Sequence, residues 1–461
     1  MSEQIADYLT HYLSLCEEKD VFVVPSLRRM LEKATDGGPI PDAFKLNGNQ
    51  PDLSYTRLSD SYIPVLLKPL APCGVALREL DLGCNEIGDE GAKSIASWLK
   101  EDVTLESLNL RYNNIGPQGV GAIAQALQIN EVLRSLDMSG NGASEEGGME
   151  MANMLQLNTS LEALNLARTY LTATALIALS TVLHNNTSLI TLNISNNYSA
   201  RGTTFSSSVA ADVMQHVTRM LETGNFTLRN VACAKMRICD DDVVNGWSTA
   251  VKANLRIAEL DLSSNNITRD GGVALFRAMH SHPALVVVKL SSCSIKDEGA
   301  DAVASMLENN YALQTLWIDY NGITGKGLLA IAKSLPRNQY LRRIAVWGNK
   351  WDVPACEAWA ALIGGPLVDV TYDDDLHGRI VEPGETFPQE GRRIINVQAK
   401  GSAQAAAEKH GSNGALNQHQ SPVKTGQAAQ VKQRFVQRDV DVSFYAVEGV
   451  VHVARNESGA T

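Results

Sequence analysis

The residues of this chain that could do chemistry are cysteines, histidines and two runs of aspartates. The seven cysteines are scattered and form no Cys-x-x-Cys pair, and the nine histidines are equally dispersed. Zinc sites need such ligands in close pairs, so the spacing of the cysteines and histidines argues against a zinc site. An odd number of scattered cysteines also suits a reducing compartment, in which disulfide bonds are rare. Asp240–Asp242 stands where a helix should begin, and Asp373–Asp375 follows a strand pattern. We interpret the first run as helix-capping charge and the second as a solvated end of the fold.

Sequence motifs of catalysis and nucleotide binding are absent from the chain. It contains no G-x-x-x-x-G-K-[ST], no H-E-x-x-H and no G-x-S-x-G. We therefore expect no enzymatic activity, no cofactor and no metal. The function must then lie in the surfaces that the fold presents.

Charge and hydropathy narrow the class of partner. The 461 residues carry a net charge of -11, while the tail from Leu376 holds ten Lys and Arg against eight Asp and Glu. The acidic body argues against a nucleic-acid partner. No stretch approaches the roughly 18 apolar residues of a membrane span, and the first residues lack the basic region of a signal peptide. We expect a cytoplasmic protein that binds other proteins.

A repeated pattern occupies most of the chain. Its unit begins Leu-x-x-Leu-x-Leu-x-x-Asn, first as Leu77, Leu80, Leu82 and Asn85. The first apolar residue recurs at a spacing of 28, except for one interval of 39 and one of 29. These positions are Leu77, Leu105, Leu133, Leu161, Leu189, Leu228, Ile257, Leu285, Leu313 and Leu341. A fixed period of this length indicates a stacked array, because one unit cannot bury its leucines alone.

The period of the apolar residues changes within each unit. Leu80 and Leu82 are two apart, which predicts a strand, whereas Ile95, Ala96 and Leu99 follow one face of a helix. The asparagine after the strand can bond the backbone of its own turn and of the neighbouring turn. It forms a structural ladder of Asn85, Asn113, Asn141, Asn197, Asn265, Asn321 and Asn349. Before each strand stands a second asparagine, expected as a helix C-cap, at Asn130, Asn158, Asn186, Asn254, Asn310 and Asn338.

From Leu77 to Gly365 the units resemble the ribonuclease-inhibitor type of leucine-rich repeat, since ten units agree in phase. The resemblance implies an α/β solenoid, a horseshoe with a parallel sheet inside and helices outside. It also implies protein binding without catalysis, and several proteins of this type are structural parts of ciliary and flagellar axonemes.

The rest of the chain predicts closing elements for the array. We expect a helical N-terminal cap over residues 1–43 and an array of about 11–12 units over residues 44–375, beginning with a degenerate unit at Phe44 and ending with a strand near Leu367. The long unit carries an insertion near residues 198–212, expected as a loop on one rim. A flexible low-complexity linker then covers residues 376–433, and residues 434–461 form a β-hairpin that turns at Glu448-Gly449.

The predicted inner face changes character along the array. In the first five units its side chains are polar with an acidic bias, whereas aromatic and basic residues gather in the last units. Exposed Trp, Tyr and Arg on neighbouring strands are typical of a protein-binding hot spot. The candidate binding residues are Trp317, Tyr320, Arg342, Arg343, Trp347, Lys289 and Asp319. The alternative is that the C-terminal hairpin covers this surface.

Several functions fit such a scaffold. The structural one is a part of a ciliary or flagellar axoneme, and the regulatory one is a soluble adaptor in the cytoplasm or nucleolus. A remote alternative is a GTPase-activating protein of the Ran type, which uses this class of repeat but carries a strongly acidic segment after the array. Nucleotide-gated innate sensors also use it, but no nucleotide-binding domain precedes the array here.

Overall fold

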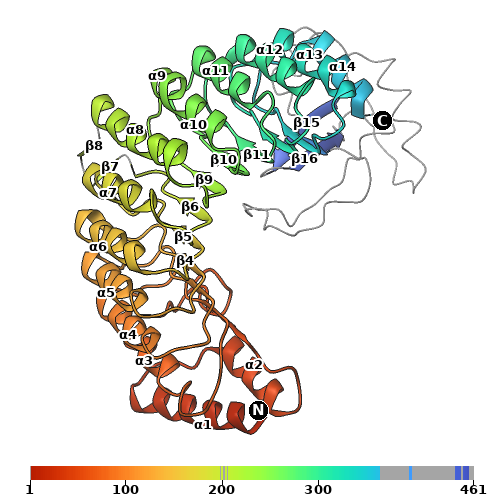
Figure 1. Cartoon of the computed structure of the whole chain (residues 1–461). Helices are drawn as coiled ribbons and strands as arrows, with labels where there is room; N and C mark the ends of the chain where they lie inside the picture. The colour runs from red at the N-terminus through yellow and green to blue at the C-terminus, as the bar shows by residue number, and fades with distance from the viewer. Residues whose placement is uncertain are drawn as a thin grey trace, which may run out of the picture. The chain divides into compact units, whose positions relative to one another are not determined.

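The computed structural model describes residues 2–197, 199–200, 203–204, 206–363, 394–396, 442–447 and 450–455. The chain divides into two compact units, Met1–Arg237 and Ile238–Thr461, each described here by itself. In both units the helices line one side of a parallel sheet (Figure 1). Within the described ranges, every helix is too short or too polar to span a membrane.

The N-terminal unit opens with two helices and then alternates strand and helix. Its first elements are α1 (Ser2–Glu18), α2 (Pro25–Thr35), β1 (Ala43–Lys45) and α3 (Tyr62–Leu67). The repeats follow as β2 (Glu79–Asp81), α4 (Asp89–Leu99), β3 (Ser107–Asn109), α5 (Pro117–Leu127), β4 (Ser135–Asp137), α6 (Ser144–Leu157), β5 (Ala163–Asn165) and α7 (Ala173–Leu183). The unit ends with β6 (Thr191–Asn193), β7 (Ser199–Ala200), β8 (Thr203–Thr204), α8 (Ser207–Thr223) and β9 (Asn230–Ala232).

The C-terminal unit continues the alternation. It begins with α9 (Asp240–Asp242), the π-helical turn η1 (Val243–Trp247) and α10 (Ser248–Ala253). Next come β10 (Glu259–Asp261), α11 (Arg269–Met279), β11 (Val287–Lys289), α12 (Lys296–Leu307), β12 (Thr315–Trp317), α13 (Gly325–Ser334), the 3-10 turn η2 (Leu335–Arg337), β13 (Arg343–Ala345) and α14 (Val353–Ile363). The last strands are β14 (Ile394–Asn396), β15 (Val442–Val447) and β16 (Val450–Arg455).

Strand register confirms the predicted repeat. In the N-terminal unit the parallel sheet runs β1-β2-β3-β4-β5-β6-β9, and in the C-terminal unit it runs β10-β11-β12-β13-β14. Leu80 pairs with Leu108 and Leu108 with Leu136, each one repeat along the chain. Phe44 pairs with Leu80, so the degenerate opening segment is the first strand of the array. The α/β leucine-rich solenoid is therefore confirmed.

The strands β1 to β6 and β9 to β13 of the parallel sheets are each three residues long and turn their central side chains into the core. Leu80 and Leu82 are fully buried, as are Ile95 and Leu99 on the facing side of α4. Each such side chain stabilises the fold by roughly 1.5–3 kcal/mol through loss of contact with water. Trp247 and Trp359 are also buried.

The ladder asparagines join successive turns through their side chains. Asn113 donates from Nδ2 to the carbonyl of Leu110 in its own unit at 2.9 Å and to that of Leu82 in the preceding unit at 3.0 Å. Its Oδ1 accepts from the backbone N–H of Ile87 at 3.1 Å. One buried amide thus satisfies three backbone groups that the turns would otherwise leave without partners.

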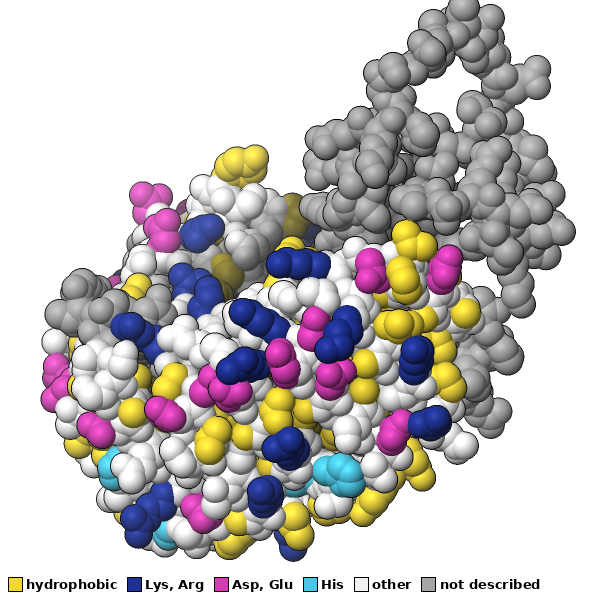
Figure 2. All heavy atoms as spheres, turned by 90° about the horizontal axis from the view of Figure 1, so that it is seen from above, with side chains coloured by type: hydrophobic (Ala, Val, Ile, Leu, Met, Phe, Trp, Pro, Cys, Tyr) yellow, Lys and Arg dark blue, Asp and Glu magenta, His cyan; other side chains and the backbone are white. Residues whose placement is uncertain are grey.

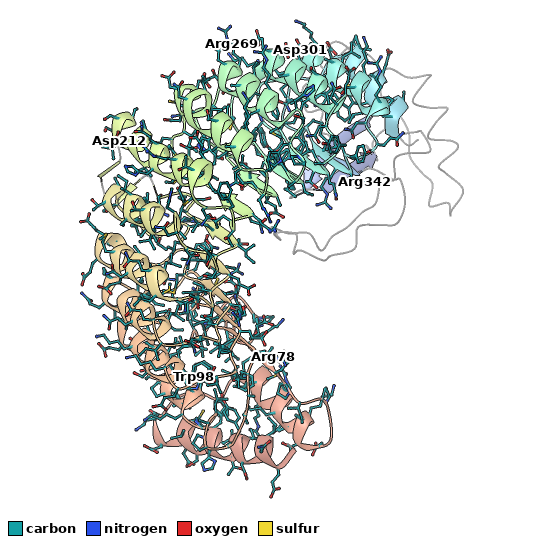
Figure 3. All side chains as sticks on the ribbon, in the orientation of Figure 1. Arg78, Trp98, Asp212, Arg269, Asp301 and Arg342 are labelled. Atoms are coloured by element: carbon teal, nitrogen blue, oxygen red, sulfur yellow. The ribbon has the colours of Figure 1, made fainter. Side chains whose placement is uncertain are left out.

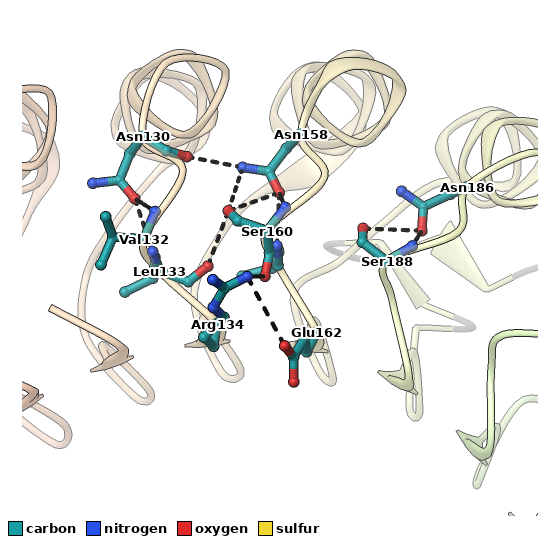
Figure 4. Close-up of polar contacts among 10 residues, drawn as sticks. Asn130, Val132, Leu133, Arg134, Asn158, Ser160, Glu162, Asn186 and Ser188 are labelled. Carbon is teal, nitrogen blue, oxygen red and sulfur yellow. Dashed lines mark hydrogen bonds and ion pairs between the residues drawn. The ribbon is translucent and has the colours of Figure 1, made fainter. Parts of the chain in front are cut away.

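The second row of asparagines caps the preceding unit as well as its own loop. Asn158 donates from Nδ2 to the carbonyl of Leu127, the last residue of α5, at 2.7 Å. Its Oδ1 accepts from the N–H groups of Ser160 and Leu161 at 3.0 and 2.8 Å (Figure 4). Asn158 stands at the C-cap position of α6, as the sequence predicted, and its bond to the end of α5 is an additional contact. Asn225 belongs to this row although the longer unit hides its spacing.

His282 takes the place of an asparagine in this second row. Its Nε2 lies 3.0 Å from the carbonyl oxygen of Asn254, and its Nδ1 accepts from the N–H groups of Ala284 and Leu285 at 3.3 and 3.0 Å. These contacts require the neutral ring, with the proton on Nε2. Burial lowers the pKa of His282, while the bond to Asn254 opposes that shift.

This ring should make the fold sensitive to acid. Above about pH 6.5 the imidazole is neutral in both states, so its contribution to stability is complete. Below that pH the unfolded chain gains a proton that the folded ring resists, so the contribution of His282 to the free energy of unfolding falls. In urea titrations between pH 7 and pH 5, the wild type should therefore lose stability relative to His282→Asn as the pH falls. The control His280→Asn should retain the full pH dependence; equal slopes for the two variants would contradict the assignment.

Two segments differ from the sequence expectation, and the predicted C-terminal hairpin agrees with it. The long unit is not a simple loop, because β7 pairs with β8 and α8 has 17 residues where α7 has 11. Ile394–Asn396, placed in the flexible linker, instead forms β14, which pairs in parallel with β13. Val442–Val447 and Val450–Arg455 form an antiparallel hairpin around Glu448-Gly449. The strand expected near Leu367, the Asp373–Asp375 run and the rest of the linker lie outside the described residues.

Candidate functional site: the strand face of the C-terminal unit

The strand face of the C-terminal unit gathers five of the predicted binding residues. We call Lys289, Trp317, Tyr320, Arg342 and Trp347 the strand-face cluster. Lys289 and Trp317 are direct partners on β11 and β12, and Trp317 is next to Ala345 on β13. Side chains alternate along a strand, so residues flanking the buried Leu316 point away from the core. Figure 3 shows Arg342 on the strand side of its unit, with Arg269 and Asp301 on the helix side.

Two aromatic rings at the strand ends form the rigid part of this cluster. Tyr320 packs edge-on against Trp347 with ring centroids 4.4 Å apart. The backbone holds the pair, because the N–H of Tyr320 donates to the carbonyl of Trp347 at 2.9 Å. The Tyr320 ring also covers Gly348, where any Cβ would collide with it. Tyr320 keeps 48% of its surface exposed, so a large ring is presented in a fixed orientation.

Two acidic residues, Asp319 just past β12 and Glu259 on β10, lie near the cluster. Asp319 is buried and accepts a hydrogen bond from Ser291 Oγ at 2.5 Å. Burial raises the pKa of Asp319 to about 6, against the lowering effect of that bond. Burial also raises the pKa of Glu259 on β10, which Lys289 partly opposes. Burial thus makes Asp319 and Glu259 harder to ionise, whereas Lys289 and Arg342 carry positive charge on the same face.

The seven predicted residues do not all reach the surface. Tyr320 is exposed, and Lys289, Trp317, Arg342 and Trp347 are half-buried. Asp319 and Arg343 are buried, at 4% and 7% exposure, so the expectation of an exposed arginine at 343 is wrong. Arg343 stands on β13 between β12 and β14, where strands flank it on both sides. The indole N–H of Trp347 donates no hydrogen bond within the described part of the chain.

The N-terminal unit presents a different strand face. Two of its strand-face arginines are paired, Arg78 with Glu106 at 3.2 Å and Arg134 with Glu162 at 3.9 Å. A row of Asp and Asn side chains on β2 to β6 accepts from the backbone two residues later, as Asp137 does from Ser139 at 2.8 Å. No aromatic residue stands on these strands. This face therefore lacks the exposed rings that the strand-face cluster presents.

The aspartates at helix starts act as caps between units. Asp240 accepts from the N–H groups of Thr268 and Gly271, at 2.7 and 3.1 Å, at the start of the next helix. Asp89 does the same for Gly116 and Gly119. A carboxylate at a helix N-terminus is favoured by the helix dipole. The sequence predicted the capping charge but not that it serves the following unit.

Other reactive groups give no sign of a catalytic centre. No group of three His, Cys, Asp or Glu within the described ranges is arranged to hold a metal ion. All seven cysteines are free, and burial raises the pKa of the Cys293 thiol to about 11. Cys293 stands in the asparagine ladder and donates to the Leu262 carbonyl. The face drawn in Figure 2 carries Lys and Arg among Asp and Glu, without a large area of one sign.

Sequence comparison agrees with the register of the sheet. A family model described as Leucine Rich repeat matches residues 77–96, 102–124, 257–276, 282–304 and 312–332. These segments of the chain are leucine-rich repeats. Leucine-rich repeats suggest a protein-binding scaffold. No curated protein matches the chain.

Solved structures with related repeats are distant. The Rad7 and Elc1 complex in yeast is 14% identical with a TM-score of 0.37, covering 75% of this chain and 90% of that one. Leiomodin-1 actin-binding site 2 is 20% identical with a TM-score of 0.26, covering 30% and 75%. The tropomodulin C-terminal domain of Caenorhabditis elegans is 14% identical with a TM-score of 0.27, covering 41% and 90%. Likenesses this weak do not indicate what this chain binds.

Proposed function

We propose that this protein is a non-enzymatic scaffold that holds a partner protein on the strand face of its C-terminal unit. The observation that carries the proposal is the strand-face cluster, in which Tyr320 packs against Trp347 and Trp317 is in register with Lys289. Arg342 lies on the same strand side, just before β13 (Figure 3). Tyr, Trp and Arg dominate the energetics of protein interfaces. Because strands and turns fix these side chains, little conformational entropy is lost when a partner binds.

Affinity capture with two matched variants tests this proposal. Trp317→Ala with Arg342→Glu changes two half-buried members of the cluster and leaves the buried Arg343 in place. The control, Tyr311→Ala with Arg277→Glu, makes the same chemical changes at exposed positions outside it. The cluster variant should capture at least tenfold less of a partner that the wild type captures, as expected for hot-spot residues. Its melting temperature should equal that of the control. Equal retention of that partner by both variants would refute the proposal.

We further propose that the assembly served by this scaffold is a ciliary or flagellar axoneme. Support comes from the resemblance to axonemal repeat proteins of the ribonuclease-inhibitor type. The sequences RLSDSYIPVLLKPL and DVSFYAVEGVVHVA also resemble those of leucine-rich-repeat-containing protein thirty-four. Localisation in the cytoplasm, with enrichment in the cilium, belongs to the same proposal. The alternative is a soluble adaptor of the cytoplasm or nucleolus.

Detergent extraction of ciliated cells separates these two versions. An axonemal component should remain with tubulin in the insoluble fraction after mild detergent. Release of the protein into the soluble fraction would exclude the structural version and leave the adaptor.

A further inference from the structure

The N-terminal unit carries a basic and aromatic rim where its strands end. We define the strand-end rim as Arg111, Tyr112, Arg168, Tyr170, Lys235 and Arg237. Tyr112 and Tyr170 are 45% and 39% exposed, and Arg111, Arg168 and Lys235 are exposed as well. These residues lie outside the strand-face cluster, and they belong to the unit that ends at Arg237.

The rim cations differ from two arginines on the strand face of the same unit. Arg78 and Arg134 pair with glutamates on the strand face. In contrast, Arg111, Arg168 and Lys235 have no ion pair within the described residues. Asp89 and Glu145, which start the adjacent helices, are engaged by the next unit. Glu86 adds one exposed carboxylate at the beginning of the rim, so the net charge of the exposed side chains along the rim is positive.

The rim side chains are also held in place. Arg168 places its guanidinium carbon 5.5 Å from the centroid of the Tyr112 ring, and its Nη1 lies 3.4 Å from the Tyr112 hydroxyl. Gly140 stands between them, and a Cβ there would come within 2.5 Å of the ring. Tyr112, Arg168, Tyr170 and Lys235 all have positive φ, a conformation that glycine or asparagine adopts at less cost. The rim thus presents large side chains from turns that favour small residues.

The spacing of the cations specifies an extended ligand. Arg168 and Lys235 occupy the same turn position as Tyr112, and Gly140 and Asn196 occupy it in the units between. Arg111 precedes this position by one residue, so the turns that carry cations recur in alternate units. Alternate strands of a sheet lie about 9.5 Å apart. Three residues of an extended chain span about 10 Å. An extended segment with carboxylates at every third position therefore matches the spacing of the turns that carry the cations.

We propose that the strand-end rim of the N-terminal unit binds an extended acidic segment of a partner protein, with acidic residues three positions apart. The cations attract the carboxylates, and the exposed rings of Tyr112 and Tyr170 pack against the intervening side chains. This surface is independent of the strand-face cluster, so a single partner or two different ones can use the two sites.

Fluorescence anisotropy on the full chain at physiological salt tests this proposal. The probe is a fluorescein-labelled peptide of about twelve residues with glutamate at every third position, separated by serine and glycine. A second peptide of the same composition has its glutamates contiguous. The spaced peptide should bind at least fivefold more tightly than the contiguous one. Equal affinity for the two peptides, or tighter binding of poly-uridylate than of the spaced peptide, would overturn the proposal.

Two charge-neutralising variants locate the binding. Arg168→Gln with Lys235→Gln should weaken the spaced peptide at least tenfold. The control, Arg78→Gln with Arg134→Gln, removes the same charge from paired residues of the same unit and should change affinity less than twofold. Circular dichroism melting verifies that both variants fold. If both variants weaken the peptide equally, net charge alone explains binding and the rim is not the site.

Discussion

Replacement of Leu290 by aspartate should unfold the repeats around β11. Leu290 is fully buried, and its carbonyl accepts a hydrogen bond from Asn321 Nδ2 at 2.7 Å. The substitution removes the stabilisation from burying the leucine side chain, roughly 1.5–3 kcal/mol. It also buries a carboxylate that has no ion-pair partner, at a cost of several further kcal/mol. Urea unfolding followed by circular dichroism should show a loss of about 5 kcal/mol or more.

The matched control for this variant is Ser292→Asp. Ser292 is exposed and lies two residues along the chain, so the same charge is added without burial. Its free energy of unfolding should change by about 0.5 kcal/mol or less. Similar unfolding curves for Leu290→Asp and Ser292→Asp would show that the assigned strand register is wrong.

Removal of one ladder asparagine should be almost as costly. Asn141 is 1% exposed and donates to the carbonyls of Leu110 and Met138 at 2.8 and 2.9 Å. It also accepts from the N–H of Ile115 at 3.2 Å. Asn141→Ala leaves these three buried groups without their partner, and each such group costs about 1–3 kcal/mol. We expect a loss of about 3–6 kcal/mol in urea unfolding.

Asn185→Ala provides the comparison for the ladder variant. Asn185 is exposed, and within the described chain its side chain makes no hydrogen bond. The free energy of unfolding should therefore stay within about 0.5 kcal/mol of wild type. A loss below about 1 kcal/mol for Asn141→Ala would mean that water replaces the amide and that the ladder does not hold the turns together.

The repeat could be predicted because its physics acts locally and identically in every unit. The alternation of Leu80 and Leu82 gives the strand, and the constant interval to Leu108 gives the register. The ladder role of Asn85 follows from its place in a turn whose backbone groups need partners. The same reasoning identified the degenerate first strand at Phe44, although its unit keeps little of the pattern.

Other features escaped prediction because they depend on contacts between units. His282 was missed because its imidazole makes the hydrogen bonds that an asparagine amide makes in the other units. Only the geometry shows that the two side chains occupy equivalent positions. The alternation along the strand predicts that Arg343, which flanks the core residue Ile344, is exposed. That alternation does not reveal that β14 lies beside β13. The β14 segment stands in sequence without repeat periodicity, so no local signal marks it as a strand. The rim tyrosines occupy turn positions whose left-handed backbone is invisible in the sequence.

Site-specific photo-crosslinking in cells tests the binding site on the C-terminal unit most directly. A benzophenone amino acid replaces Trp317 in the strand-face cluster, and in a parallel protein it replaces Asp301, which lies on the helix side (Figure 3). We predict that irradiation crosslinks a defined partner to position 317 and not to position 301. A partner crosslinked at position 301, with none at position 317, would place binding on the helices and contradict this account.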